Sequence, residues 1–262
     1  MDKHTFMSLV DKKLITEVDY VDYYVQNPEK LEAMSIEELV QSGIVKEVSA
    51  SSYVAPKFGE GGEFKLEQDV YLTYPIIIEK DTVIDLNGFN IINDVIFVDE
   101  SDNSTNCYVF WVKNGKLTVK GEGNVQAIAG SAYDMAVWAN GGNVDIQGGS
   151  YISKGKYNDG SDCVYSSNGS AVKIYGGRFE CMNLSRSYAE PQYAILNEKG
   201  KANGTIEVFG GEFVKFNPAD NVSENPKKNF CAPGYVVEQD GDVFRVVKGE
   251  EKEPEIEVES AE

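Results

Sequence analysis

Aliphatic and polar residues alternate along the middle of the chain, and each alternating run ends at a glycine. The run has the form aliphatic, any residue, aliphatic, any residue, glycine, and it occurs at residues 84–88, 117–121, 144–148, 172–176 and 206–210. Alternation with a period of two is typical of a β-strand with one buried face. A glycine after such a strand marks a corner where a side chain would be in the way. The pattern therefore predicts a repeated unit of strand and corner.

The spacing of these runs is nearly regular. Successive copies begin 27 to 34 residues apart. A second pattern, a pair of residues two positions apart, recurs ahead of the runs at nearly the same spacing. Its copies are Val109-Trp111, Ala136-Trp138, Cys163-Tyr165 and Ala194-Leu196. A strand-containing repeat of this length is typical of a solenoid, in which each turn buries its apolar face against its neighbours. Helical repeats are disfavoured because glycine inside a helix costs about 1 kcal/mol relative to alanine.

We therefore predict an all-β protein, a right-handed parallel β-helix of about five coils over residues 65–228. Stacking the copies gives two inward ladders of aliphatic residues. The first ladder is Ile84, Leu117, Val144, Val172 and Ile206. The second ladder is Leu86, Val119, Ile146, Ile174 and Val208. The residues between them form a polar outward column of Asp85, Thr118, Asp145, Lys173 and Glu207.

The first 50 residues have a different pattern. Six apolar residues at intervals of three or four form one stripe of a helix, which ends at Asn27-Pro28 because proline lacks a backbone donor. Ser35 begins a capping-box sequence before a second helix that ends at Gly43. A strand over residues 18–25 remains an alternative. We predict a short N-terminal helical segment, residues 1–50, for docking or oligomerisation. Its predicted docking residues are Phe6, Val10, Leu14, Val18, Val21 and Val25.

Two further segments flank the repeats. Residues 51–64 are rich in Ser, Gly and Pro, a composition typical of a linker. Near the C-terminus, two strand-like runs flank Asp240-Gly241, a strong signal for a two-residue hairpin turn. The predicted hairpin, residues 229–248, would cover the end of the solenoid, whose exposed backbone edge otherwise promotes aggregation. Residues 249–262 are predicted to form an acidic tail.

Composition limits the partners that the chain can bind. Its 262 residues include 24 Lys and Arg against 43 Asp and Glu, a net charge of −19. This charge disfavours nucleic acid and anionic membranes, because both attract an excess of positive charge. The chain has no apolar leader and no run of roughly 18 apolar residues, so we expect neither a signal peptide nor a membrane span. In a reducing cytoplasm the four cysteines are expected to be buried free thiols.

Several polysaccharide-cleaving enzymes are parallel β-helices, and glycoside hydrolysis needs two carboxylates that face each other. Asp85 and Asp145 share the predicted outward column two strands apart, a separation of roughly 9.6 Å at about 4.8 Å per strand. The chain has no Asp-Asp pair, however, and its one histidine, His4, lies outside the repeats. We also expect no arginine beside an acidic cluster of the repeat columns. We predict that the protein is not an enzyme and has no catalytic residues.

Two acidic loops could bind calcium. One holds Asp99, Glu100 and Asp102, and the other holds Asp159 and Asp162. Neither fits the spacing of the 12-residue calcium loop with its terminal glutamate. We predict no metal site and no cofactor.

Trp111, Trp138 and Tyr165 form a column of aromatic residues in the second pattern. Facing outward, the column could stack on sugar rings, and facing inward, it would be part of the core. We interpret it as core, because aromatic side chains in the wall of a solenoid are large apolar surfaces to bury. Sugar binding remains the alternative.

Residues 210–247, together with TVIDLNG at residues 82–88, resemble the final coil and closing hairpin of a known family. These are the short β-helix head-fibre and other surface-fibre proteins of tailed bacteriophage virions. The resemblance covers residues 65–248 and leaves the first 50 residues outside it. It implies that a small N-terminal part docks to the particle while the β-helix projects outward, usually in a symmetric oligomer.

We therefore expect a non-enzymatic head fibre or capsid decoration protein, displayed for contact with the host or its surface glycans. The resemblance implies a homo-oligomer attached to a capsid or other virion protein through the N-terminal segment. We expect a trimer, because a rod of five coils is short and the apolar stripe from Phe6 to Val25 has no obvious partner within its own chain. Its expected location is the virion, and the host cytoplasm during assembly. A carbohydrate-active β-helix enzyme, such as a polysaccharide depolymerase, is the main alternative. A bacterial surface adhesin is a second alternative, disfavoured by the missing secretion signal.

Overall fold

The computed structural model describes residues 15–17, 45–47, 57–98, 104–154, 162–182, 195–199, 204–221 and 229–250. The chain divides into two compact units, Met1–Ala55 and Pro56–Glu262. Apart from one short 3₁₀ helix, the regular elements of the described residues are strands. The predicted all-β class is confirmed.

The described residues of the first unit form a pair of strands, and one of these lies where the sequence predicted a helix. β1 (Ile15–Glu17) pairs antiparallel with β2 (Val45–Glu47). β1 falls in the middle of the predicted helical stripe, so a single helix through that stripe is wrong. The reason is tertiary pairing, because the β-branched residues Ile15 and Thr16 are better suited to an extended strand that has a partner. The predicted docking residues Phe6, Val10, Leu14, Val18, Val21 and Val25 lie outside the described residues.

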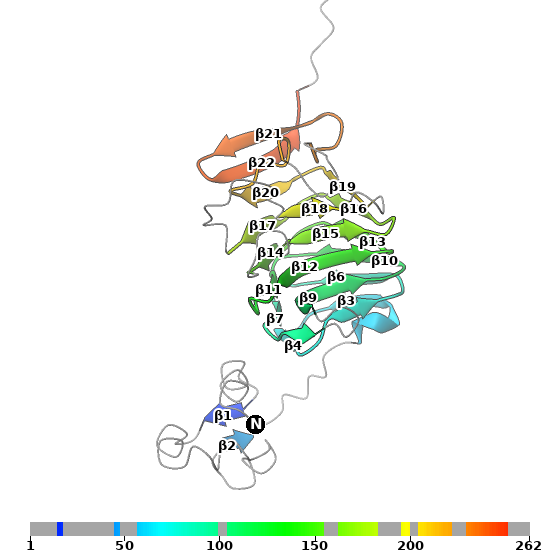
Figure 1. Cartoon of the computed structure of the whole chain (residues 1–262), viewed down its shortest axis with the longest axis vertical. Helices are drawn as coiled ribbons and strands as arrows, with labels where there is room; N and C mark the ends of the chain where they lie inside the picture. Colours follow the sequence, from blue (N-terminus) through cyan, green and yellow to red (C-terminus); the bar gives the residue numbers. More distant parts are fainter. Residues whose placement is uncertain are drawn as a thin grey trace, which may run out of the picture. The chain divides into compact units, whose positions relative to one another are not determined.

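The second unit consists of three sheets that the chain enters in turn (Figure 1). The first sheet contains β3 (Gly62–Lys65), β6 (Thr82–Asp85), β10 (Lys116–Lys120), β13 (Asn143–Ile146), β16 (Ala171–Ile174) and β19 (Thr205–Val208). The second contains β4 (Val70–Leu72), β7 (Ile91–Asn93), β11 (Asn124–Ala127), β14 (Ser150–Ser153), β17 (Arg178–Cys181) and β20 (Gly211–Val214). The third contains β5 (Ile76–Ile78), β9 (Thr105–Val112), β12 (Tyr133–Asn140), β15 (Val164–Ser167) and β18 (Leu196–Glu198).

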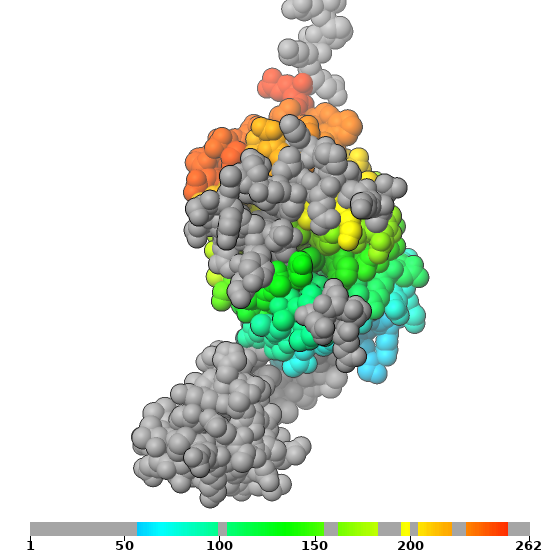
Figure 2. Space-filling model, viewed as in Figure 1, coloured from blue at the N-terminus to red at the C-terminus, as the bar shows by residue number. Residues whose placement is uncertain are grey.

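These strands pair in parallel within each sheet, and neighbours in a sheet come from successive repeats of the sequence. A short strand, β8 (Phe97–Val98), joins the third sheet by antiparallel pairing with β9. In the space-filling view, the colours of this unit therefore follow one another in bands from cyan to orange (Figure 2).

The core lies between the three sheets and is built from side chains that stand on their equivalents one strand away. In the first sheet Ile146 lies opposite both Val119 and Ile174, and Ile174 lies opposite Val208. All four are fully buried. The predicted ladders are therefore correct for the last four copies.

The ladders slip by two residues at the first copy. Val119 pairs with Ile84, and Leu117 pairs with Thr82. The buried polar Thr82 thus begins the first ladder, and Leu86 lies beyond the end of β6.

A longer corner causes this slip. Two more residues separate β6 from β7 than separate β13 from β14, and Asn87 and Gly88 take left-handed φ values of 50° and 86° there. Leu86 is fully buried at this corner, and its Cδ1 atom would lie 2.7 Å from a Cβ on Gly149. The side chain fills space that the glycine leaves empty.

Aromatic rings close the core in the second sheet. The rings of Tyr151 and Phe179 are 5.0 Å apart at an interplanar angle of 11°, and those of Phe179 and Phe213 are 4.9 Å apart at 9°. At the N-terminal end, Phe58 in the 3₁₀ helix η1 (Phe58–Glu60) is buried, and the Thr82 hydroxyl donates to its carbonyl at 3.2 Å.

The predicted C-terminal hairpin is present. β21 (Tyr235–Asp240) and β22 (Val243–Lys248) pair antiparallel around Gly241, whose φ is 58°. β22 also pairs antiparallel with β20, so the hairpin extends the second sheet beyond its last parallel strand.

Replacing Ile174 with asparagine should unfold the second unit at much lower urea concentration than wild type. The change leaves an amide between two fully buried aliphatic side chains, and we expect a loss of roughly 3 kcal/mol or more in the free energy of unfolding. Lys173→Asn places the same side chain on the exposed face of the same strand and should cost less than about 1 kcal/mol. Equal losses for the two variants would show that the assignment of faces is wrong.

Tyr151→Phe should leave the protein as stable as wild type or more stable. The Tyr151 hydroxyl is buried without a hydrogen-bond partner among the described residues, and burial raises the pKa of this phenol. Removing an unsatisfied buried hydroxyl is expected to gain up to about 1 kcal/mol in thermal or urea unfolding. Tyr175→Phe, at a residue that is 45% exposed, is the control and should change nothing. A clear loss of stability in Tyr151→Phe would reveal a bonded hydroxyl.

Candidate functional site

A groove of about 590 Å³ lies where the chain turns from the first sheet into the second. We call it the corner groove. It is lined by residues 122–124, 149–150, 176–178, 211–212 and 245–247, which come from four successive corners and from β22. A volume of this size is within the range of small-ligand sites.

Glycines form the floor of the corner groove because the corners stack backbone on backbone. A Cβ on Gly177 would lie 2.9 Å from the carbonyl oxygen of Gly149, and one on Gly211 would lie 3.0 Å from that of Gly177. Both glycines have left-handed φ values, 106° and 113°. Close packing of the corners therefore requires the glycines recognised in the sequence. Because glycine has no side chain, the floor of the groove is bare backbone.

One wall of the groove is a single polar column. Four residues at or next to the start of second-sheet strands lie opposite one another in the order Asn124, Ser150, Arg178 and Glu212, and Arg245 of β22 follows. Inward residues of the same strands, such as Tyr151 and Phe179, are buried. Since side chains alternate along a strand, the column faces outward.

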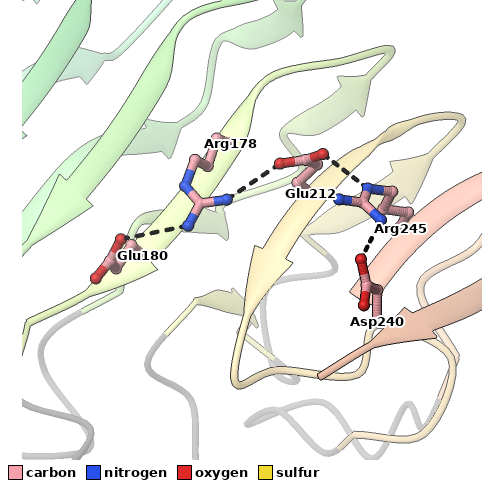
Figure 3. A network of polar contacts seen from close by, with 5 residues as sticks. All are labelled: Arg178, Glu180, Glu212, Asp240 and Arg245. Carbon is pink, nitrogen blue, oxygen red and sulfur yellow. Dashed lines mark hydrogen bonds and ion pairs between the residues drawn. The ribbon is translucent and has the colours of Figure 1, made fainter. Parts of the chain in front are cut away.

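Two arginines and three carboxylates form a network at one end of this column. Figure 3 shows Glu212 between the guanidinium groups of Arg178 and Arg245, with Glu180 and Asp240 at the ends. Glu212 accepts from Arg178 Nη1 at 3.1 Å and from Arg245 Nε at 2.8 Å. Arg245 Nη1 donates to Asp240 at 3.3 Å, and Arg178 Nη2 is 4.0 Å from Glu180. Hydrogen bonds from the two arginines, Arg245 first, hold the pKa of Glu212 below its usual value.

This network corrects the expectation that no arginine lies beside an acidic cluster. The sequence did contain a signal, because Arg178 and Glu212 occupy the same position in GGRFE and GGEFV, directly after the paired glycines. The part played by Arg245 depends on the register of β22 against β20, which the sequence pattern does not specify.

Asp85 and Asp145, the two acids considered for glycoside hydrolysis, do not share a column. Asp85 lies opposite Lys120, whereas Asp145 lies opposite Thr118, so the two carboxylates belong to different columns. Asp145 instead forms an ion pair of 2.5 Å with Lys116.

The aromatic column of the third sheet exists but faces away from the core. Trp138 lies opposite both Trp111 and Tyr165. Phe110 and Val112, on either side of Trp111, are fully buried, so Trp111 points to the outer face. The column nevertheless belongs to a second hydrophobic cluster, because Tyr165 is buried with Tyr108 and Met135 and Trp138 packs against them. The interpretation as core is therefore correct for the burial of Tyr165 and wrong for the direction in which the column faces.

The flat faces of these rings are already occupied. Trp111 and Trp138 stack at 5.0 Å with an angle of 8°, and Trp138 and Tyr165 stack at 6.4 Å. Lys113 Nζ lies 3.9 Å from the centre of the Trp111 ring. Because stacked rings present their edges, this column is poorly suited to stacking on sugars. Leu196 does not continue it, since Leu196 lies opposite Val164.

The described residues contain no group of three or more His, Cys, Asp or Glu side chains that could hold a metal ion. Asp162 is buried and accepts a hydrogen bond from Asn197 at 3.2 Å, whereas Asp99, Glu100, Asp102 and Asp159 lie outside the described residues.

The four cysteines are free thiols, and Cys107, Cys163 and Cys181 are buried while Cys231 is partly exposed. Burial raises the pKa of Cys107 to about 12, which keeps it protonated and unreactive near neutral pH.

Comparison with protein families, with curated proteins and with solved structures finds no match to this chain. No helix in the described part of the chain is long and apolar enough to cross a membrane. The assignment of function therefore depends on the fold and on the corner groove.

Glu212→Gln should lose stability relative to wild type at pH 7 but not in acid. The pKa of Glu212 is lowered from 4.5 in the folded protein, so its ion pairs are fully present above about pH 4.5 and are lost as the pH falls through the lowered value. Melting temperatures measured from pH 7 to pH 3 should therefore converge for the two proteins. The control, Glu63→Gln, removes one exposed carboxylate from β3. A difference that persists at pH 3, or that Glu63→Gln reproduces, would contradict the network's role.

Proposed function

We propose that the protein is a non-enzymatic surface fibre or capsid decoration protein of a tailed bacteriophage particle, built on a right-handed parallel β-helix of five coils. The observation that carries the proposal is the set of three parallel sheets, which the chain enters in turn and which end in the hairpin β21–β22. Each coil is stabilised by its neighbours alone, so the unit is a self-supporting scaffold suited to display.

The order of the strands supports the proposed coil count. The segments β3–β5, β6–β9, β10–β12, β13–β15 and β16–β18 each pass through the three sheets once, and β19 and β20 begin a further passage. A right-handed path is proposed because crossovers between parallel strands of a sheet are right-handed in nearly all proteins.

The chemistry of the groove supports a protein that binds rather than cleaves. Glu122 and Glu212 are its two carboxylates. A general acid needs a raised pKa, and the two arginines hold that of Glu212 low. A carbohydrate-active enzyme is the second candidate, because the groove does hold two carboxylates. Release of reducing ends from host capsular polysaccharide, lost in Glu122→Gln, would favour it over our proposal.

The division of the chain into two units supports separate roles for them. Residues 1–50 lie within the first unit, and residues 65–248 lie within the second. We propose that the first unit attaches the protein to a capsid or other virion protein and brings three copies together. The second unit would then project from the particle.

Deleting residues 1–50 should leave a folded protein that no longer joins particles. The parallel sheets supply their own interfaces, so circular dichroism should show a β-rich protein that melts cooperatively. Light scattering should give a trimer for the full chain and a monomer for the truncated one. Deletion of residues 251–262 is the control and should preserve attachment. Recovery of the protein lacking residues 1–50 on purified virions at wild-type copy number would place the anchor elsewhere.

A further inference from the structure

The outward polar column of the second sheet is continuous except at one position. On one side, Asn124 Nδ2 donates to Asn90 Oδ1, and Asn90 Nδ2 donates to Asp69 Oδ1 at 3.0 Å. On the other side, Arg178 and Glu212 belong to the arginine and carboxylate network. Between these two ladders lies Ser150, which has the smallest side chain of the column.

Ser150 therefore marks an opening in the wall of the corner groove. Its strand neighbours are Asn124 and Arg178, and all three line the groove. At about 4.8 Å per strand, the Cα atoms of Asn124 and Arg178 lie roughly 9.6 Å apart. Gly149, directly before Ser150, adds a floor of bare backbone.

The opening suits a neutral sugar ring. Asn124 and Ser150 offer both donors and acceptors, and Arg178 has more donors than the two carboxylates in its network use. Val246 and Val247 give the groove an apolar part against which the C–H groups of a sugar could pack. The strand spacing is also close to the advance per residue of an extended hexose chain.

The charges argue against an ionic ligand. The column from Asp69 to Arg245 contains two arginines and two carboxylates, and the whole chain has a net charge of −19. An anion would be repelled by the chain as a whole, and a cation would compete with Arg178 and Arg245 for Glu212. A ligand without charge avoids both costs.

We propose that the corner groove binds a neutral oligosaccharide along the stack of strands, with one sugar ring seated at Ser150 between Asn124 and Arg178. This inference rests on the proposed role in surface display and names the ligand class and the position. The bound sugar is not cleaved.

The test is calorimetric titration of the full-length protein with maltohexaose, cellohexaose, chitohexaose and the anionic hexagalacturonate. At least one neutral hexasaccharide should bind and be recovered intact. Ser150→Phe fills the opening and should weaken that binding by about tenfold or more. Thr118→Phe, on the outer face of the first sheet, is the matched control and should bind as wild type does. Ser150→Asn is a smaller filling variant, to be used if Ser150→Phe lowers the melting temperature.

Three results would overturn the proposal: no neutral hexasaccharide binds, filling at position 150 leaves affinity unchanged, or hexagalacturonate binds more tightly than the neutral sugars. Incorporation of the same variants into virions separates this proposal from the previous one. Ser150→Phe should still join particles at wild-type copy number. A protein that joins particles but binds no sugar would contradict only the sugar site, whereas a protein that binds sugar and joins no particle would contradict only the role in the virion.

Discussion

Parallel pairing between successive repeats is the constraint on which the rest of the second unit depends. It places every side chain about 4.8 Å from the equivalent side chain in the next repeat. Each column must therefore be made of side chains that can pack favourably against one another at that distance. Aliphatic residues satisfy this condition in the first sheet, and stacked rings satisfy it in the second. A charged residue satisfies it when the next residue in the column has the opposite charge, as with Arg178 and Glu212, or is polar, as with Asp69 and Asn90.

The same constraint explains why most of the ladders could be predicted from the sequence. Ile146, Ile174 and Val208 are followed by glycine at the same distance, and the corners after them have equal length, so aligning the glycines also aligned the strands. Alignment of the glycines gave the wrong register at Ile84. The corner after β6 holds extra residues, so its glycine lies farther from the end of the strand than in the other copies. Glycine marks the corner, and only pairing sets the register.

Other features depended on information that alternation does not carry. The direction of Trp111 is set by the neighbours of β9, and nothing in the spacing of aromatic residues distinguishes an inner column from an outer one. The pairing of β1 with β2 joins segments about thirty residues apart, which local helical periodicity cannot reveal. The polar network was partly visible, since Arg178 and Glu212 share a position in the repeat, but Arg245 reaches them through an antiparallel hairpin that lies outside the repeat.

The stacked corners also limit how such a chain can change over evolutionary time. The links between the first and second sheets are short and nearly uniform, whereas those that lead into the third sheet vary widely, from Leu72–Ile76 to Cys181–Leu196. A residue inserted at a stacked corner would shift every later strand or force a compensating bend, as Leu86 illustrates. New sequence can therefore accumulate in the links that lead into the third sheet, while the groove at the corner between the first and second sheets keeps its dimensions. A scaffold of this kind separates a variable face from a constant one.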